Sequence, residues 1–456
     1  MNSKNENKTN SMLYISFNQD NSFFSIGTEK GFLIYQTNPF KGPYERNMDG
    51  GIGIVEMINN SNYLALIGGG EIPRFGKNTL VIWDDNENKV ISELKFTTPI
   101  LSIKYKKDYL FVVCQKRIYI FNFENYEISE TIDTGNNKKE LIAINQISNP
   151  LILAYPSIKN ENKISIKNSS KPDIIRLKVQ DDSVSKISIN NDGSLLASAN
   201  ENGTVIRIHS CSDGTFLQEF KRGIEKAKIN SICFDMDTKF MAVSSSRGTI
   251  HIFSMGSTIK NLREHETNKQ KGENNNDSKK NKKDKKKKDK KKEDKKKKDE
   301  ENKIEDDKEK NNENKIEINS DENNEKKFDD INKDNDKFNS TSEEETKDGK
   351  ESENKNGQKE NEDIKETKKN EIIENNKEEE KLPENSKTFL GGIFGSRTEK
   401  SFAKVRIKSQ ESICAFIRSD LIAIVTSDNK YYQYEIDLKN GGDCKKKVDK
   451  NITLNK

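Results

Sequence analysis

The chain contains few of the residues on which catalytic and metal sites most often depend. Its 456 residues include only three histidines, and its five cysteines show no CxxC spacing: Cys114, Cys211, Cys233, Cys414 and Cys444. Most of these cysteines lie within hydrophobic, strand-like runs, so we interpret them as buried free thiols of a reducing compartment. Neither a glycine-rich phosphate loop nor a nucleophile motif is present. We therefore expect no catalytic residue, no metal site and no cofactor.

Long hydrophobic runs are also missing. No segment approaches the roughly 18 apolar residues that a membrane-spanning helix requires. The first ten residues, MNSKNENKTN, have neither the apolar core of a signal peptide nor the arginine-rich pattern of a transit peptide. We expect a cytoplasmic protein that reaches membranes only from the outside.

Apolar residues are scarce in one internal segment. Residues 266–386 contain 34 Lys, no Arg and 39 Asp plus Glu, with abundant Asn. Such a composition cannot bury enough apolar surface to fold, so we predict a disordered insertion. The other 335 residues carry 46 Lys plus Arg against 37 Asp plus Glu, an excess of nine cations. This basic balance favours anionic partners.

The foldable part consists of short strand patterns separated by turns, such as Asn191-Asp192-Gly193. No long amphipathic helical pattern interrupts them. Two near-copies of one unit begin 45 residues apart, at Ile187 and at Ile232, and a third begins at Ile15. Each reaches a glycine 16 residues later, at Gly203, Gly248 and Gly31 respectively. A repeat of about 40 to 45 residues with four short strands is typical of a propeller blade.

The predicted fold class is all-β, a seven-bladed β-propeller with a long disordered charged insertion in blade six. The predicted blades span residues 12–48, 50–97, 98–137, 139–180, 183–222, 227–407 and 411–440. The predicted organisation begins with a disordered N-terminus (1–11), followed by blades one to five with the first part of blade six (12–265) and by the insertion (266–386). The end of blade six and blade seven follow (387–440), and a C-terminal tail completes the chain (441–456). A long insertion is compatible with an intact ring because the entropy of loop closure grows only slowly with length.

Two adjacent cations, Lys221 and Arg222, lie at the junction of two repeats, within the sequence FKRG at 220–223. Successive side chains of an extended strand point in opposite directions, so the two cations can serve two different pockets.

Several motifs together resemble one family. They are LIGGG at 66–70, IWDD at 82–85, FKRG at 220–223 and SSSRGTIHIF at 244–253. This combination resembles the PROPPINs, phosphoinositide-binding β-propellers that include the WIPI proteins. The resemblance extends over nearly all of the foldable region.

The resemblance implies two lipid head-group pockets on the rim of blades five and six. Arg222 would share the first pocket with hydroxyl and imidazole donors: Ser245, Ser246, Thr249 and His251. Lys221 would share the second with Thr204 and Arg207. The family usually has arginine where this chain has Lys221, so the bidentate contact with phosphate is lost although the charge is kept. We therefore expect the second pocket to bind more weakly.

An apolar island follows the insertion. Phe389, Leu390, Ile393 and Phe394 recur at helical spacing between cationic residues, a weak form of an interfacial helix. The resemblance implies a membrane-inserting loop in this blade. The alternative is that these side chains pack against the edge of the propeller.

The resemblance implies a monomeric, non-enzymatic effector on phosphoinositide-containing membranes. It would bind phosphatidylinositol 3-phosphate and phosphatidylinositol 3,5-bisphosphate, and recruit autophagy lipid-transfer or conjugation proteins to autophagosomal, endosomal or vacuolar membranes. The bias towards Asn and Lys is similar to that of apicomplexan parasites, in which the role would extend to maintenance of the plastid.

Two other functions are compatible with parts of the sequence. A protein scaffold similar to WD-repeat proteins would use the propeller face and would bind no lipid. The lysine tract at 279–298 is compatible with nucleic-acid binding, but acidic residues interrupt it and no aromatic residue is present for base stacking. We therefore expect no nucleic-acid partner.

Overall fold

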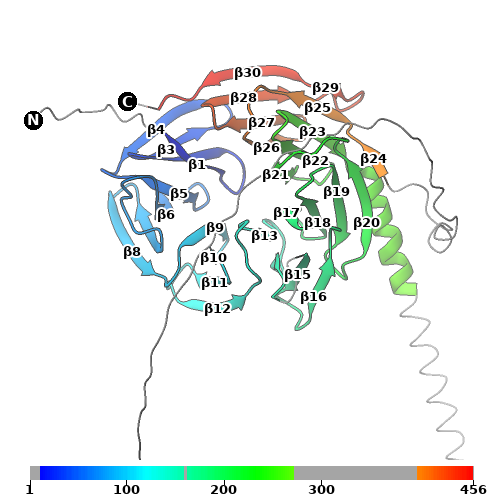
Figure 1. Cartoon of the computed structure of the whole chain (residues 1–456), viewed down its shortest axis with the longest axis horizontal. Coiled ribbons are helices and arrows are strands. Elements are labelled where there is room, and N and C mark those ends of the chain that lie inside the picture. Colours follow the sequence, from blue (N-terminus) through cyan, green and yellow to red (C-terminus); the bar gives the residue numbers. More distant parts are fainter. Residues whose placement is uncertain (1–10, 159–161, 272–397, 455–456) are drawn as a thin grey trace, which may run out of the picture. The chain divides into compact units, whose positions relative to one another are not determined.

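The structure, a computed structural model, describes residues 11–158, 162–271 and 398–454. All of them belong to one compact unit, Met1–Asn276 with Ile393–Lys456. They form seven sheets arranged around a central axis (Figure 1). Each sheet has four antiparallel strands, and two of the sheets carry a fifth, short parallel strand at one edge. The prediction of a seven-bladed β-propeller is confirmed.

The first four blades each occupy one continuous stretch of chain. Blade one consists of β1 (Met12–Phe17), β2 (Phe23–Thr28), β3 (Gly31–Gln36) and β4 (Lys41–Asn47). Blade two consists of β5 (Ile52–Met57), β6 (Tyr63–Gly68), β7 (Thr79–Asp84) and β8 (Lys89–Lys95). Blade three consists of β9 (Ile100–Lys106), β10 (Tyr109–Cys114), β11 (Arg117–Asn122) and β12 (Ile128–Asp133). Blade four consists of β13 (Ala143–Ile144), β14 (Ile152–Pro156), β15 (Lys163–Asn168) and β16 (Ile174–Lys178).

Of the last three blades, only blade six draws its four main strands from both sides of the long charged segment. Blade five consists of β17 (Val184–Ile189), β18 (Leu195–Asn200), β19 (Val205–Ser210) and β20 (Phe216–Lys221). Blade six consists of β21 (Ile229–Phe234), β22 (Phe240–Ser245), β23 (Thr249–Ser254) and β25 (Ala403–Arg406). Blade seven consists of β26 (Ser412–Arg418), β27 (Leu421–Thr426), β28 (Lys430–Glu435) and β30 (Lys445–Asn451). Two short strands add parallel edges, β24 (Thr398–Lys400) on β20 and β29 (Gly442–Asp443) on β25.

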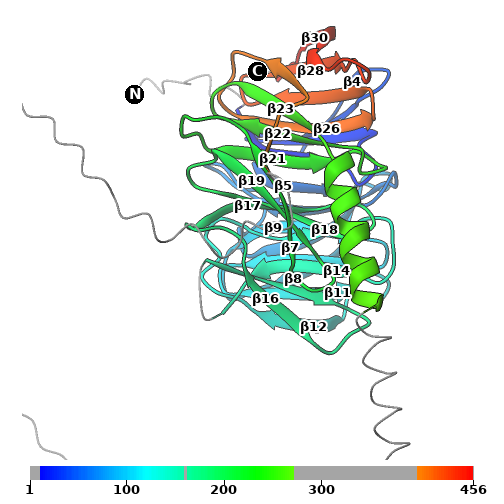
Figure 2. The same ribbon diagram turned by 90° about the vertical axis from the view of Figure 1, so that its right-hand side faces the viewer.

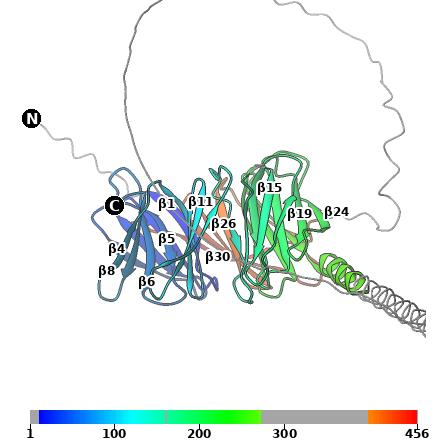
Figure 3. The same ribbon diagram turned by 90° about the horizontal axis from the view of Figure 1, so that it is seen from below.

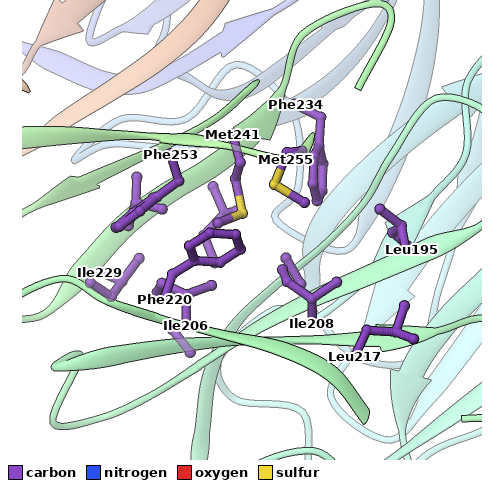
Figure 4. Close-up of a cluster of buried hydrophobic side chains, with 14 of the residues drawn as sticks. Leu195, Ile206, Ile208, Leu217, Phe220, Ile229, Phe234, Met241, Phe253 and Met255 are labelled. Carbon is purple, nitrogen blue, oxygen red and sulfur yellow. The ribbon is translucent and has the colours of Figure 1, made fainter. Parts of the chain in front are cut away.

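The core lies between neighbouring blades. Every residue of β22 and of β27 is buried, because the second strand of a blade is covered on both faces. Between blades five and six, the rings of Phe220 and Phe253 have centroids 4.9 Å apart within a cluster of buried apolar side chains (Figure 4). This packing fixes the relative position of the two blades on which the candidate site lies.

The repeated glycine has a steric cause in these two blades. Gly203 and Gly248 adopt φ values of +58° and +66°, in the left-handed region that side chains disfavour. A Cβ atom would lie 2.0 Å from the oxygen of Ala227 at the first position and 2.4 Å from that of Ile407 at the second. Only glycine fits at these two turns, which explains why both repeats contain it.

A helix at residues 256–271 was not predicted from the sequence. It runs along the outside of the ring (Figure 2), and Met255, Ile259 and Leu262 join the core cluster of blades five and six. The prediction of disorder from residue 266 is therefore wrong for 266–271. Ile259 and Leu262 anchor the first turns of the helix, and most of its charged residues follow after them. Within the described residues, no helix has both the length and the apolar character that crossing a bilayer requires.

Both described ends of the chain next to residues 272–397 are attached to blade five. On the helix, Asn261 Nδ2 donates a hydrogen bond to the oxygen of Leu217 at 3.1 Å. His265 Nε2 lies 2.6 Å from Asp213 Oδ2. On the returning side, β24 pairs with β20 (Figure 1), although the chain connects it to blade six. In Figure 3, β24 is labelled beside β19 of blade five.

The predicted C-terminal tail, 441–456, is wrong as far as the structure describes it. Residues 442–443 form β29, and 445–451 form the outer strand of blade seven. The sequence KKKVDKN contains a single apolar residue because six of its seven side chains are exposed on the outer edge. Its composition therefore resembles that of a tail.

The ring closes without a shared strand. Blade one is built only from the first strands of the chain, and blade seven only from the last ones. Phe24 and Tyr431 stack across this seam with centroids 5.4 Å apart, and Tyr431 Oη donates a hydrogen bond to the oxygen of Thr37 at 2.8 Å. Side-chain packing therefore completes the propeller.

Candidate anion-binding site on blades five and six

The FKRG sequence places its two cations differently. Phe220 is fully buried, Lys221 is exposed at the end of β20, and Arg222 is only 7% exposed. The backbone N–H of Arg222 donates to the oxygen of Thr204 at 2.8 Å, which extends the strand pairing by one residue. The alternation predicted from strand geometry is present.

The guanidinium of Arg222 is held in one orientation. Its Nε donates a hydrogen bond to the oxygen of Gly203 at 2.7 Å, and one terminal nitrogen donates to the oxygen of Glu225. Burial lowers the pKa of Arg222, nearby Arg247 lowers it further, and Glu225 opposes this shift. An arginine remains charged despite such a shift, so a fixed and partly desolvated cation lies between the two blades.

His251 lies in a group of three cations. Its strand, β23, pairs with β25, so that His251 is opposite Lys404 and Thr249 is opposite Arg406. Burial lowers the pKa of His251 to about 4, and the charges of Arg222, Lys404 and Arg406 contribute to the shift. The buried Nδ1 of His251 has no hydrogen-bond partner among the described residues. An anion bound here would reduce the repulsion between these charges and could accept hydrogen bonds from the site.

Lys404 and Arg406 were not identified as site residues from the sequence. They lie about 150 residues after His251, beyond the segment that the structure leaves undescribed. The signal was nevertheless present, because the predicted blade six extends to residue 407, so its last strand must follow the insertion. Alternation along that strand puts positions 404 and 406 on one face, and antiparallel pairing brings that face to Thr249 and His251.

The two serines of this predicted pocket already have partners. Ser245 is fully buried, and its hydroxyl donates a hydrogen bond to the oxygen of Thr249 at 3.3 Å. Ser246 Oγ accepts a hydrogen bond from the backbone N–H of Lys228 at 3.1 Å. Both hydroxyls therefore stabilise the turn between β22 and β23 in this structure. Their contact with a ligand stays a prediction.

The second predicted pocket is closer to charge neutrality. Arg207 Nη2 lies 2.6 Å from Asp181 Oδ2, and Arg207 Nε lies 3.0 Å from Glu219 Oε2. A phosphate would have to compete with both carboxylates for this guanidinium. Lys221 pairs in register with Lys400 of β24, which brings a further cation to the exposed edge of blade five.

The predicted membrane-inserting side chains lie outside the described residues. Phe389, Leu390, Ile393 and Phe394 all fall within 272–397. The structure places Arg222, Thr249 and His251 together with Lys404 and Arg406. Thr204, Arg207 and Lys221 all lie on the neighbouring blade, where Lys221 pairs with Val205 and Arg207 with Glu219.

The fold and the site define a class: a seven-bladed β-propeller with a cationic rim site between blades five and six. The PROPPIN family model matches residues 11–275. This match covers more than half of the chain, so the chain belongs to the PROPPIN family.

Curated relatives agree with this assignment. The chain is 32% identical over 251 residues to Autophagy-related protein 18e of Arabidopsis thaliana, with 54% of this chain and 66% of the relative covered. It is 31% identical over 245 residues to Autophagy-related protein 18 of Dictyostelium discoideum, with 54% and 65% covered. The chain thus spans about two thirds of the length of these relatives.

Solved structures show the same fold at low sequence identity. Kluyveromyces lactis Hsv2 matches with a TM-score of 0.59 and 17% identity, over 98% of this chain and all of that chain. A chain from a complex of KlAtg21 with the coiled-coil of AgAtg16 matches with a TM-score of 0.58 and 17% identity, over 97% of this chain and all of that one.

Proposed function

We propose that the chain is a non-enzymatic peripheral membrane effector that binds phosphoinositides phosphorylated at the 3-position. The supporting observation is the cationic group around His251, formed by Arg222, Lys404 and Arg406. A phosphate monoester is a compact anion with several strong acceptor oxygens, and charge-assisted hydrogen bonds to such groups are among the strongest in proteins. The head groups are those of phosphatidylinositol 3-phosphate and phosphatidylinositol 3,5-bisphosphate.

The second pocket, with Lys221, Thr204 and Arg207, contributes a weaker contact. Two modest sites on one ring bind a membrane more strongly than either alone, because the second contact is intramolecular. Each cation near an anionic surface contributes about 1 kcal/mol. Loss of the Arg222 pocket should therefore remove most of the binding.

The names of the relatives support a role in autophagy. On a membrane, the chain recruits autophagy proteins of the lipid-transfer or conjugation machinery, and it acts as a monomer on the cytoplasmic face of autophagosomal, endosomal or vacuolar membranes. The complex of KlAtg21 with a coiled-coil of AgAtg16 supports a coiled-coil partner for this chain.

Vesicle co-sedimentation tests the proposed lipid binding. Full-length protein is mixed with neutral vesicles that contain or lack phosphatidylinositol 3-phosphate, and the double variant Lys221→Thr, Arg222→Thr is compared with wild type. We expect specific sedimentation of the wild type and its loss in the double variant. A Lys239→Ala variant is the control, since this exposed lysine lies in the turn between β21 and β22. Equal sedimentation of wild type and double variant would contradict the proposal and favour a scaffold without lipid binding.

A further inference from the structure

Ile224 has the most exposed large hydrophobic side chain among the described residues. It is 84% exposed, and Ile72 follows with 67%. A single exposed apolar residue has no functional meaning by itself. Ile224, however, lies two residues after Arg222, in the turn that connects blade five to blade six.

The turn that carries Ile224 is held at both ends. Before it, the backbone N–H groups of Arg222 and Gly223 both donate to the oxygen of Thr204. After it, the N–H of Ala227 donates to the oxygen of Asn202 at 3.0 Å. Burial of Ile224 by a partner therefore costs little additional conformational entropy, because the backbone of the turn is already fixed.

The guanidinium of Arg222 also holds this turn, through its hydrogen bond to the oxygen of Glu225. The residue that orients the candidate head-group pocket thus also positions the exposed isoleucine. Pocket and side chain form one local unit.

Cations surround this turn. Lys226 follows Ile224 by two residues and is exposed, and Lys221 precedes it by three. Neither lysine forms an ion pair with a described residue, whereas Glu225 is neutralised by Arg247. An apolar side chain among free cations suits the interface of an anionic membrane, which offers acyl chains beneath a negatively charged surface.

We propose that Ile224 inserts into the head-group and acyl boundary of an anionic membrane while the Arg222 pocket holds a phosphorylated head group. This inference rests on the proposed function. The apolar contact lies beside the pocket on the same turn, so it becomes intramolecular once the head group is bound.

Vesicle and soluble-ligand titrations separate insertion from head-group binding. Ile224→Ser is compared with wild type on vesicles that contain phosphatidylinositol 3-phosphate and phosphatidylserine, and with soluble inositol 1,3-bisphosphate. We expect roughly tenfold weaker binding to vesicles, as loss of a partly buried aliphatic side chain implies, and unchanged binding to the soluble head group. Ile72→Ser, which changes an exposed isoleucine on blade two, should leave both affinities unchanged.

Other outcomes have distinct meanings. If wild type binds neither the vesicles nor the soluble head group, the proposed function fails and the inference fails with it. If wild type binds both and Ile224→Ser binds the vesicles equally well, only the insertion is overturned. Weaker binding of the soluble head group by Ile224→Ser would show that the variant disturbs the pocket, and would also overturn the assignment.

A spectroscopic variant tests insertion directly. The chain has one tryptophan, Trp83, which is 7% exposed on blade two, so its emission serves as a constant background. Ile224→Trp should show a blue shift on vesicles that contain phosphatidylinositol 3-phosphate, and quenching by lipids brominated in the upper acyl chain. Binding without either change would place residue 224 in water and overturn the proposal.

Discussion

The rims of blades five and six have the same strand geometry but opposite charge arrangements. Arg207 on β19 and His251 on β23 occupy equal positions in the repeat. Arg207 lies opposite Glu219 of β20, whereas His251 lies opposite Lys404 of β25. Asp181, on the segment before β17, adds a second carboxylate beside Arg207. The outer strand and this segment together make the pocket on blade five nearly neutral, whereas the outer strand of blade six makes its pocket cationic. The comparison indicates that repetition supplies the positions, and that the residues on neighbouring segments set the charge at each position.

The largest effect should come from Arg222→Ala. A charged hydrogen-bond donor contributes about 1.5 to 3 kcal/mol, so we expect roughly 10- to 100-fold weaker binding to vesicles with phosphatidylinositol 3-phosphate. The melting temperature should also fall, since the guanidinium fixes the turn after β20. Arg222→Lys keeps the charge but loses the bidentate hydrogen-bond geometry, so its affinity for the vesicles should lie between those of wild type and Arg222→Ala. If Arg222→Ala kept the wild-type affinity, the cationic site on blade six would not be what distinguishes it from blade five in vesicle binding.

Lys404→Ala should have the next largest effect. The loss of one cation near an anionic surface implies roughly fivefold weaker binding. Lys239→Ala, at the other end of β22, removes an exposed charge from the same blade and should change binding little. Titration of vesicle binding at two salt concentrations should show a shallower salt dependence for Lys404→Ala only. Equal effects of the two variants would mean that general charge, and not the site on blade six, attracts the membrane.

Glu219→Gln should make the charge of the pocket on blade five more similar to that on blade six. The amide keeps the size of the side chain but removes one of the two carboxylates that neutralise Arg207. We expect a gain of roughly two- to fivefold in vesicle affinity. The gain should disappear when Lys221→Thr is added, because both changes act on the same pocket. An unchanged affinity would show that this pocket does not contact the head group.

The last comparison concerns pH and sets His209 against His251. Burial lowers the pKa of each to about 4, whereas an unfolded histidine titrates near pH 6.5. As the pH falls, these histidines therefore become protonated in the unfolded state before they do in the folded state. Each histidine contributes stability that is complete above about pH 6.5 and is lost as the pH falls towards 4.

A bound phosphate ligand should reduce this loss of stability at only one of the two histidines. A bound phosphate raises the pKa of His251, so soluble inositol 1,3-bisphosphate should restore part of the melting temperature at pH 5. His209 packs edge-on against Phe216 with centroids 5.7 Å apart and should not respond. The restoration should disappear in His251→Gln and persist in His209→Gln. The reverse pattern would place the anion on blade five.

The blades were predictable because their signals are local. The repeats of blades five and six combine buried strands with a glycine that a larger residue could not replace without a clash, Gly203 and Gly248 respectively. The Lys221 and Arg222 alternation was predictable for the same reason. Outer strands give weaker signals, since solvent covers one of their faces. Residues 445–451 therefore looked like a tail.

Contacts between distant segments were harder to predict. Lys404 reaches His251 only through a strand pairing that crosses the whole insertion, and the parallel pairing of β24 with β20 has no signature in the sequence. The ion pairs of Arg207 were also missed, because Asp181 lies 26 residues before it on another segment. Charge composition alone did not show that this cation is already neutralised.

The attachment of both described chain ends to blade five has a mechanical consequence. The helix is bonded to Leu217 at the start of β20, and β24 pairs with Glu219, Phe220 and Lys221 near its end. A pull on either side of residues 272–397 therefore reaches blade five first, through Asp213 and Leu217 on the helix side and through β20 on the other. Tension exerted on β24 would act on the strand that leads directly into Arg222, so such a force would act on the candidate anion-binding site.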